Sequence, residues 1–282
     1  RLVVNLSLGW SPDYGGSTGA RSTWPLDVQA VYSALEDAHC RGVLAIAAAG
    51  NTSNGPSGNL GPIVPAAWEQ LPAPNRSRCF QVLGHRWDSS LNRVRTAYKP
   101  FLYAASGVDF KGDDIAISRQ GGRARIAAYA DHAVTMDGFG DYTETLTGTS
   151  VSAVVVSAAA ATAWFYKPSA SLYDIMNLVY RSGARIRKRA DFCRSFGGSC
   201  TASTRRVTVC EAAKRACSTS GSGSYCPGVF GGCEPWDKTP VAIGTLDYSG
   251  FDPAAADHNL EYAPVNTSDV ACGITRLAYA AD

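Results

Sequence analysis

Ser150 lies in a tight turn directly before a predicted helix, a position that suits a nucleophile. The turn Leu146 to Ser150, with the sequence LTGTS, leads into Val151 to Phe165, a run of small and β-branched residues long enough for a helix. Gly148 permits a close approach of the backbone, and the first turn of a helix favours developing negative charge. We therefore predict Ser150 as a candidate nucleophile. The alternative is that Thr149 or Ser150 only caps a buried helix.

A second stretch supplies a donor of the kind that an oxyanion requires. Ala47 to Asn51, with the sequence AAAGN, closes an apolar run, and the Asn51 side-chain amide could donate to an oxyanion beside Ser150. The alternative is an ordinary asparagine in a turn after Gly50. A serine hydrolase of the α/β-hydrolase kind is disfavoured, because the sequence has no G-x-S-x-G elbow around Ser150.

The elements that would position these residues follow an alternating order. Arg1 to Gly9 and Val43 to Ala49 are short, apolar and rich in β-branched or small residues, as is typical of strands buried on both faces. Between them, helical spacing of apolar residues predicts a helix from Pro25 to Arg41. Strand, helix and strand within about fifty residues predict a parallel βαβ unit.

Further elements extend this α/β pattern. We predict strands at Cys79 to Gly84 and Ala124 to Tyr129, and a helix from Thr149 to about Tyr166, which Pro168 ends. Another helix should begin at Ser171, whose side chain could cap it.

Three segments, in this order, resemble the subtilisin-like serine peptidases, the subtilases. Asn5 to Gly9 matches the family's Ser-Leu-Gly segment, Ala48 to Asn51 its Ala-Ala-Gly-Asn segment, and Gly148 to Ser152 its Gly-Thr-Ser-Met-Ala helix, with Val and Ser replacing Met and Ala. Two intermediate segments also fit, namely Phe80 to Ser90 as a strand with its turn and Ile117 to Ala130 as the approach to a later strand. The resemblance covers roughly residues 1 to 187.

The resemblance implies a three-layer αβα fold with a mostly parallel sheet and the hydrolysis of peptide bonds through an acyl-enzyme. It implies that Ser150 is the nucleophile and Asn51 the oxyanion donor, roles for which subtilisin itself is a standard example. The polypeptide substrate would lie as an added strand beside Ser7, Leu8 and Gly9. Its residue before the scissile bond would enter a pocket lined by Ala48, Ala49 and Gly50. Because these wall residues are small, the pocket is expected to accept a large apolar side chain of the substrate. No cofactor is implied; structural calcium is common in the family, but no ligand cluster stands out.

The sequence departs from the family in its acid and base. The family's order is Asp, His, Ser, and both earlier motifs precede the Ser-Leu-Gly segment at which this sequence begins. We therefore expect the family's N-terminal segment to be missing here and to be a partner of the fold. The four histidines are predicted to be surface or supporting residues and not the base: His39, His85, His132 and His258. A circular permutation that uses Val241 to Glu261 is an alternative, and so is a catalytically incomplete protein that binds peptide or serves as a scaffold.

The cysteines, the basic residues and the net charge predict the cellular compartment, the domain boundary and the classes of partner. Six of the nine cysteines crowd between Cys193 and Cys233, which predicts a disulfide framework in a secreted or periplasmic protein. A zinc site is disfavoured, because that segment has no C-x-x-C pair and no histidine. The basic run Arg181 to Ala190 predicts a solvated linker, with a dibasic processing site as the alternative. Either interpretation predicts a catalytic domain at 1–187 and a disulfide-rich extension at 188–282. A net charge of +2 gives no argument for nucleic acid or a membrane surface.

Overall fold

The protein is built around one six-stranded sheet. The computed structural model describes residues 1–52, 60–86, 88–92, 97–133, 145–193 and 202–218. The strand order is β1-β2-β3-β4-β6-β5; the pairs are parallel except for the antiparallel β5–β6 pair at one edge. The strands are β1 Val3–Leu6, β2 Leu44–Ala48, β3 Tyr103–Val108, β4 Ile126–Tyr129, β5 Ala184–Arg189 and β6 Ser203–Arg206.

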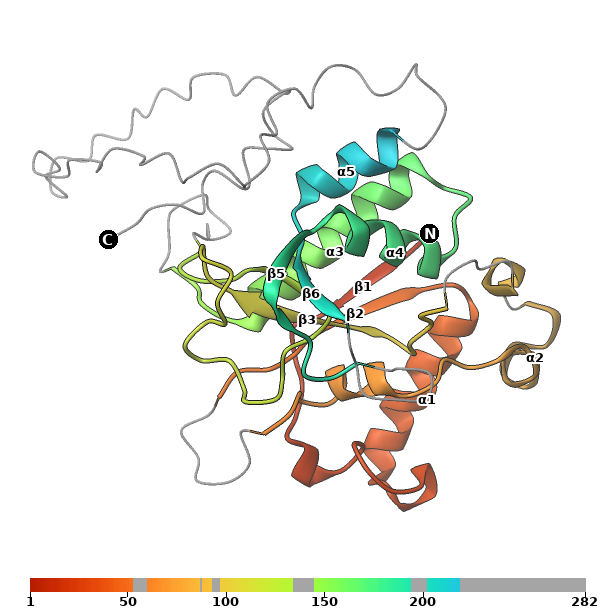
Figure 1. Ribbon diagram of the computed structural model, residues 1–282. Helices are drawn as coiled ribbons and strands as arrows, with labels where there is room; N and C mark the ends of the chain where they lie inside the picture. The colour runs from red at the N-terminus through yellow and green to blue at the C-terminus, as the bar shows by residue number, and fades with distance from the viewer. Residues whose placement is uncertain (53–59, 87, 93–96, 134–144, 194–201, 219–282) are drawn as a thin grey trace, which may run out of the picture.

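Helices cover both faces of this sheet (Figure 1). The α-helices are α1 Leu26–Cys40, α2 Arg76–Leu83, α3 Thr149–Tyr166, α4 Leu172–Ser182 and α5 Val209–Ser218. The short 3-10 helices are η1 Pro12–Tyr14, η2 Arg21–Thr23, η3 Ala66–Gln70, η4 Gly84–Arg86 and η5 Ser89–Asn92. One core joins the sheet to α3, α4 and α5, and a second joins the other face to α1 and η3. The predicted three-layer αβα fold with a mostly parallel sheet is confirmed.

Small side chains explain how α3 can lie against four strands at once. Ala153, Ala159, Ala160 and Ala163 are fully buried, and α3 contacts β1, β2, β3 and β4. Because alanine dominates that face, with Val156 as a buried branched residue among them, the helix backbone approaches the sheet closely. By length and composition α3 is also apolar enough to cross a membrane, but here it is a core helix. Its bounds agree with the helix predicted from the sequence.

The strand predicted at Cys79 to Gly84 is wrong, because this segment forms α2. The Asn75 side chain caps the helix by accepting from the Arg78 amide, and Cys79 is its one buried residue. A central strand would bury most of its side chains, whereas Phe80 is 47% exposed. The strand that the resemblance placed at Phe80 to Ser90 was therefore misplaced, and the next strand along the chain is β3.

The sheet also continues past the predicted boundary at residue 187. That boundary lies inside β5, and the basic run predicted as a linker is an edge strand whose outward side chains are charged. Charged residues are typical of exposed edges, since they discourage pairing with another chain. β6 pairs with β4, and α5 packs on α3 within the same core. The division at 187/188 stays a prediction, and most of the proposed extension lies outside the described residues.

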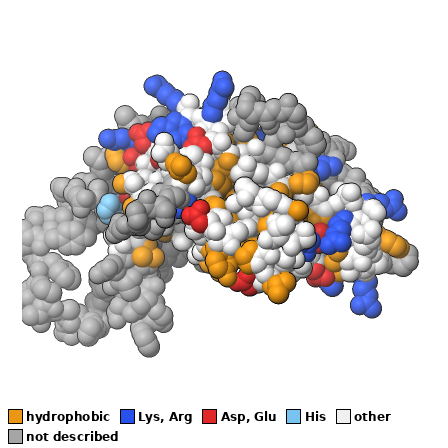
Figure 2. Space-filling view, turned by 90° about the horizontal axis from the view of Figure 1, so that it is seen from below, with side chains coloured by type: hydrophobic (Ala, Val, Ile, Leu, Met, Phe, Trp, Pro, Cys, Tyr) orange, Lys and Arg blue, Asp and Glu red, His pale blue; other side chains and the backbone are white. Residues whose placement is uncertain are grey.

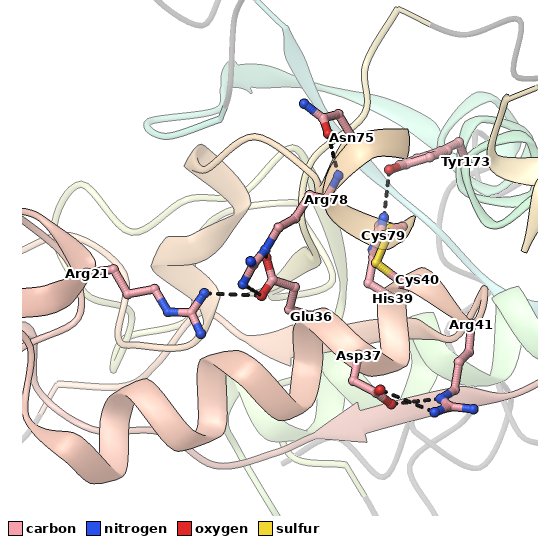
Figure 3. Close-up of a disulfide and its surroundings, with 10 residues drawn as sticks. All are labelled: Arg21, Glu36, Asp37, His39, Cys40, Arg41, Asn75, Arg78, Cys79 and Tyr173. Carbon is pink, nitrogen blue, oxygen red and sulfur yellow. Dashed lines mark hydrogen bonds and ion pairs between the residues drawn. A yellow bond between two sulfur atoms is a disulfide. The ribbon is translucent and has the colours of Figure 1, made fainter. Parts of the chain in front are cut away.

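A disulfide and a buried carboxylate hold α2 against α1 (Figure 3). Cys40 and Cys79 are bonded, 39 residues apart in the chain, and both are buried. Glu36 accepts two hydrogen bonds from Arg78, at 2.6 and 2.8 Å, and one from Arg21 at 3.1 Å. Burial acts to raise the pKa of Glu36, but these hydrogen bonds outweigh it and leave the pKa lowered. Cys193, Cys210 and Cys217 are also disulfide-bonded.

We expect removal of the Cys40–Cys79 bond to destabilise the protein strongly. A closed loop of this length restricts the unfolded chain, which corresponds to about 4 kcal/mol of stability in the chain-entropy description. Urea unfolding of Cys40→Ala/Cys79→Ala beside the wild type measures the loss. A loss below about 1 kcal/mol would mean that the Glu36–Arg78 pair and the packing of α1 alone hold α2 in place.

Charges of both signs are distributed over the surface. On the described part of the face seen in Figure 2, Lys and Arg side chains lie at several separate places, with Asp and Glu between them. Hydrophobic side chains form scattered patches on the same face. This distribution agrees with the small net charge of the sequence, +2.

Candidate active site

Ser150 lies in the first turn of α3, as the sequence predicted. Gly148 precedes the helix, and its amide donates to the Ala130 carbonyl at 2.9 Å, which fixes the turn to the end of β4. The Ser150 hydroxyl is half-buried and donates to the Ser7 carbonyl at 3.5 Å, a long hydrogen bond. In return, the Ser7 hydroxyl donates to the Ser150 carbonyl at 3.1 Å. The turn therefore places Ser150 beside the end of β1, where its hydroxyl donates only this one long hydrogen bond among the described residues.

Asn51 lies against the same turn. Its Oδ1 accepts from the Thr149 amide at 3.0 Å and from the Thr149 hydroxyl at 3.1 Å, so it satisfies one of the free amides of the helix end. The Thr149 hydroxyl accepts from the Gly50 amide at 2.9 Å. A Cβ on Gly148 would come within 2.9 Å of Asn51 Nδ2, so only glycine leaves the amide its position there. This network holds the Asn51 amide group next to Ser150.

Ser7, Leu8 and Gly9 continue from the end of β1 and are exposed to solvent. They lie outside any strand of the sheet, and the chain returns to a pairing interaction at Trp10, which bridges Val64. An exposed segment that continues an edge strand is a place where a peptide can add as a further strand. The hydrogen bonds between Ser7 and Ser150 place this segment directly beside the predicted nucleophile.

Ala48 ends β2 beside that segment and Ala49 and Gly50 follow it, and all three are buried. The space beside them contains Ile63, which the sequence did not indicate. The Ile63 amide donates to the Ala49 carbonyl at 3.0 Å, and Gly50 adopts φ +101°, a conformation that favours glycine. The only sequence signal near Ile63 is its place between two prolines, which predicts a turn and gives no pairing partner.

Neither histidine whose side chain the structure describes binds Ser150. The His39 ring is buried in α1 and shares a 2.8 Å hydrogen bond with the Tyr173 hydroxyl (Figure 3). His132 Nδ1 lies 3.0 Å from Asp131 Oδ1, and its side chain is 57% exposed. The side chain of His85, and His258 with the whole segment Val241 to Glu261, lie outside the described residues.

Acid should destabilise the protein through His39. Burial lowers its pKa from 6.5 to about 4, against the opposing effects of a hydrogen bond to the Phe101 backbone and of the Glu36 charge. Between these values the unfolded chain binds a proton that the folded chain does not, so stability is lost as the pH falls from 6.5 to 4, by about 3 kcal/mol in all. Urea unfolding at several pH values should show this loss, and His39→Gln should reduce it. His132→Gln, which replaces an exposed ring, is the control, and an unchanged slope in His39→Gln would contradict the assignment.

A separate polar cleft of about 640 Å³ opens beside Gly50 and Thr149, toward Ser106 of β3 and the chain that precedes β4. Its charged residues are Asp114, Arg119, Arg123 and Asp191. Arg123 pairs with both carboxylates, and the Arg119 guanidinium donates to the Gly61 carbonyl at 2.7 Å. Neither Ser150 nor the segment Ser7 to Gly9 lines this cleft. The described residues contain no group of three or more His, Cys, Asp or Glu side chains that could hold a metal ion, and the absence of a cofactor stays a prediction.

Comparison with known proteins places the chain in a family. The Subtilase family (Peptidase S8) matches residues 1–198, which is more than half of the chain. No curated protein was found to match.

Solved structures that resemble the chain include the subtilase cytotoxin SubAB (17% identity, TM-score 0.44, 77% of this chain and 59% of that one). They also include the self-cleaved protease domain of PatA (19% identity, TM-score 0.45, 76% of this chain and 61% of that one). A third is MycP1 from Mycobacterium smegmatis (19% identity, TM-score 0.44, 75% of this chain and 50% of that one). The chain thus spans less than two thirds of the length of these proteins. On the family match over residues 1–198, the chain belongs to the subtilase family of serine peptidases.

Proposed function

We propose that this chain carries the nucleophile and the oxyanion donor of a subtilisin-like serine endopeptidase. In this proposal Ser150 Oγ attacks the carbonyl carbon of a peptide bond. Its proton passes to a base and then to the departing amine, and water later hydrolyses the acyl-enzyme. The Asn51 amide donates to the oxygen that becomes negative during the attack.

The observation that supports the proposal most is the convergence of three distant segments on one point. Ser150 contacts Ser7 from the end of β1, and Asn51 from the end of β2 contacts Thr149. Asn51 and Thr149 are 98 residues apart, and Ser150 and Ser7 are 143 apart. A residue that only caps a buried helix would not require an exposed strand end and a side-chain amide at the same turn.

The base is proposed to come from outside the described residues. The His39 ring is bound to Tyr173, and the His132 ring lies beside Asp131. A segment that packs next to β1, at the edge of the sheet, would bring a histidine and an aspartate closest to Ser150. The predicted N-terminal segment of the family's domain is the occupant that we propose, with a polypeptide as substrate.

The second candidate is a subtilase-like protein that binds peptide without cleaving it. The observation that favours it is the same lack of a described base at Ser150. Such a protein would keep the groove beside Ser7 to Gly9 and would show no activated serine. We also propose a secreted or periplasmic location, because the Cys40–Cys79 bond and the bonded Cys193, Cys210 and Cys217 suit an oxidising compartment.

Covalent labelling with a fluorophosphonate tests the proposal. In this reaction a bond forms between Ser150 Oγ and phosphorus while fluoride leaves, so the probe reports an activated serine. Free imidazole in the buffer supplies a base, and peptide mapping by mass spectrometry identifies the labelled residue. We expect the label on Ser150, whereas a folded chain with no label at any imidazole concentration would favour the peptide-binding candidate.

A further inference from the structure

We propose that Ile63 forms the floor of the pocket for the residue before the scissile bond and restricts that residue to glycine, alanine or serine. The inference rests on the proposed function, since it assumes that a peptide lies beside Ser7 to Gly9 with its carbonyl at Ser150. In that position the side chain of the preceding residue enters the space between the end of β1 and the end of β2.

The backbone holds Ile63 between these two strand ends. The Ile63 amide donates to the Ala49 carbonyl at 3.0 Å. The next residue, Val64, forms two hydrogen bonds with Trp10, at 2.8 and 3.1 Å. Ile63 is thus tied through its own amide to the chain that ends β2 and through Val64 to the chain that follows Gly9.

The Ile63 side chain fills the space between the two glycines that face it. A Cβ on Gly9 would lie 2.4 Å from Ile63 Cδ1, and a Cβ on Gly50 would lie 2.5 Å from Ile63 Cγ2. Real Cβ atoms do not approach other atoms so closely, so Ile63 is in contact with both strand ends at once. The wall residues Ala48 to Gly50 are small, but the Ile63 side chain already occupies the space that they would leave for a substrate side chain.

Partial exposure of Ile63 agrees with a floor that faces an open mouth. Its side chain is half-buried, whereas its neighbours Pro62 and Val64 are buried. A methyl or hydroxymethyl group on the substrate can rest on this surface. A phenylalanine or leucine side chain would have to displace Ile63 from its contacts with Gly9 and Gly50. The small wall residues Ala48 to Gly50 alone favoured a large apolar side chain, and the position of Ile63 favours the opposite preference.

Equilibrium binding of short peptides tests the inference without requiring catalysis. The probes are acetyl-Ala-Ala-Ala-X amides with X as alanine, leucine or phenylalanine, added to the 282-residue chain and followed by chemical-shift changes in NMR. The variants are Ile63→Gly, which removes the floor, and Ile63→Val, which removes only the methyl group nearest Gly9. Leu60→Ala is the matched control, because this leucine is in the same loop and its side chain is 66% exposed.

We expect the wild type to bind the alanine peptide at least about 10-fold more tightly than the phenylalanine peptide. Ile63→Gly should reverse this order, Ile63→Val should reduce the difference for leucine, and Leu60→Ala should match the wild type. Equal binding of all three peptides to the wild type would overturn the inference and leave the proposed function standing. Failure of every peptide to bind any folded variant would overturn both the inference and the proposed function. If Ile63→Gly does not fold, the comparison of the alanine and phenylalanine peptides on the wild type tests the inference alone.

Discussion

Ser150→Ala is expected to abolish fluorophosphonate labelling in imidazole buffer, down to the background of an unlabelled protein. The reaction requires a hydroxyl oxygen at the N-terminal end of α3, and alanine has none. The helix itself should persist, because alanine has a high helix propensity and the lost hydrogen bond to Ser7 is long, at 3.5 Å. Intact-protein mass spectrometry measures the labelled fraction.

Ser157→Ala is the matched control for this prediction. Ser157 lies in the same helix, and its hydroxyl is buried without a hydrogen-bond partner among the described residues. Its replacement should leave both labelling and stability nearly unchanged, since no hydrogen bond is broken. Labelling that persists in Ser150→Ala, or disappears in Ser157→Ala, would contradict the assignment of the nucleophile.

Asn51→Ala is expected to slow labelling of Ser150 by about 10²–10³-fold, the loss known for one oxyanion donor in subtilisin, a member of the same family. The donor acts on charge that develops during the attack, so its removal affects the rate and not the presence of the serine. The alanine variant also loses the acceptor for the Thr149 amide and hydroxyl. Some loss of stability, about 1 kcal/mol, should therefore accompany the loss of rate.

Asn51→Asp separates these two effects. Aspartate keeps an Oδ1 that accepts from Thr149, and a negative charge near the N-terminal end of α3 stabilises the helix. It has no amide to donate to an oxyanion. We expect Asn51→Asp to fold as the wild type does and to label as slowly as Asn51→Ala. A rate close to that of the wild type in Asn51→Asp would show that Asn51 has only a structural role.

The sequence predicted those elements that have a clear apolar run, a clear helical spacing of apolar residues or a clear capping residue. β1, β2 and α3 agree with the predicted segments, and the small and β-branched residues of β2 and α3 are buried in the core. The expected burial of β1 on both faces is wrong, because β1 lies at the edge of the sheet and Val3, Val4 and Leu6 are only half-buried. α2 was predicted as a strand, because Phe80, Val82 and Leu83 look like a short apolar run. Tertiary contacts decide its conformation: the bond from Cys79 to Cys40 and the pairing of Arg78 with Glu36 are invisible in one sequence. β5 was missed because a charged edge strand looks like a solvated linker.

The candidate site shows the same limit. Ser150, Asn51 and the segment Ser7 to Gly9 could be named in advance, because each belongs to a short motif with a defined order. Their mutual contacts, at separations of 98 and 143 residues, appear only in the fold. Ile63 has no motif, and its importance arises only from the distances to Gly9 and Gly50. Packing between distant segments is set by the whole core and is not encoded in local spacing.

The rate of Ser150 labelling as a function of imidazole concentration is the measurement that decides whether this chain carries a nucleophile without its base. We expect negligible labelling of the 282-residue chain without imidazole, and a rate that rises with imidazole and is absent in Ser150→Ala. This result would show a reactive serine in place and a base supplied from elsewhere. Rapid labelling of Ser150 without imidazole would rule out an external base, because a base within the chain would then already reach the serine.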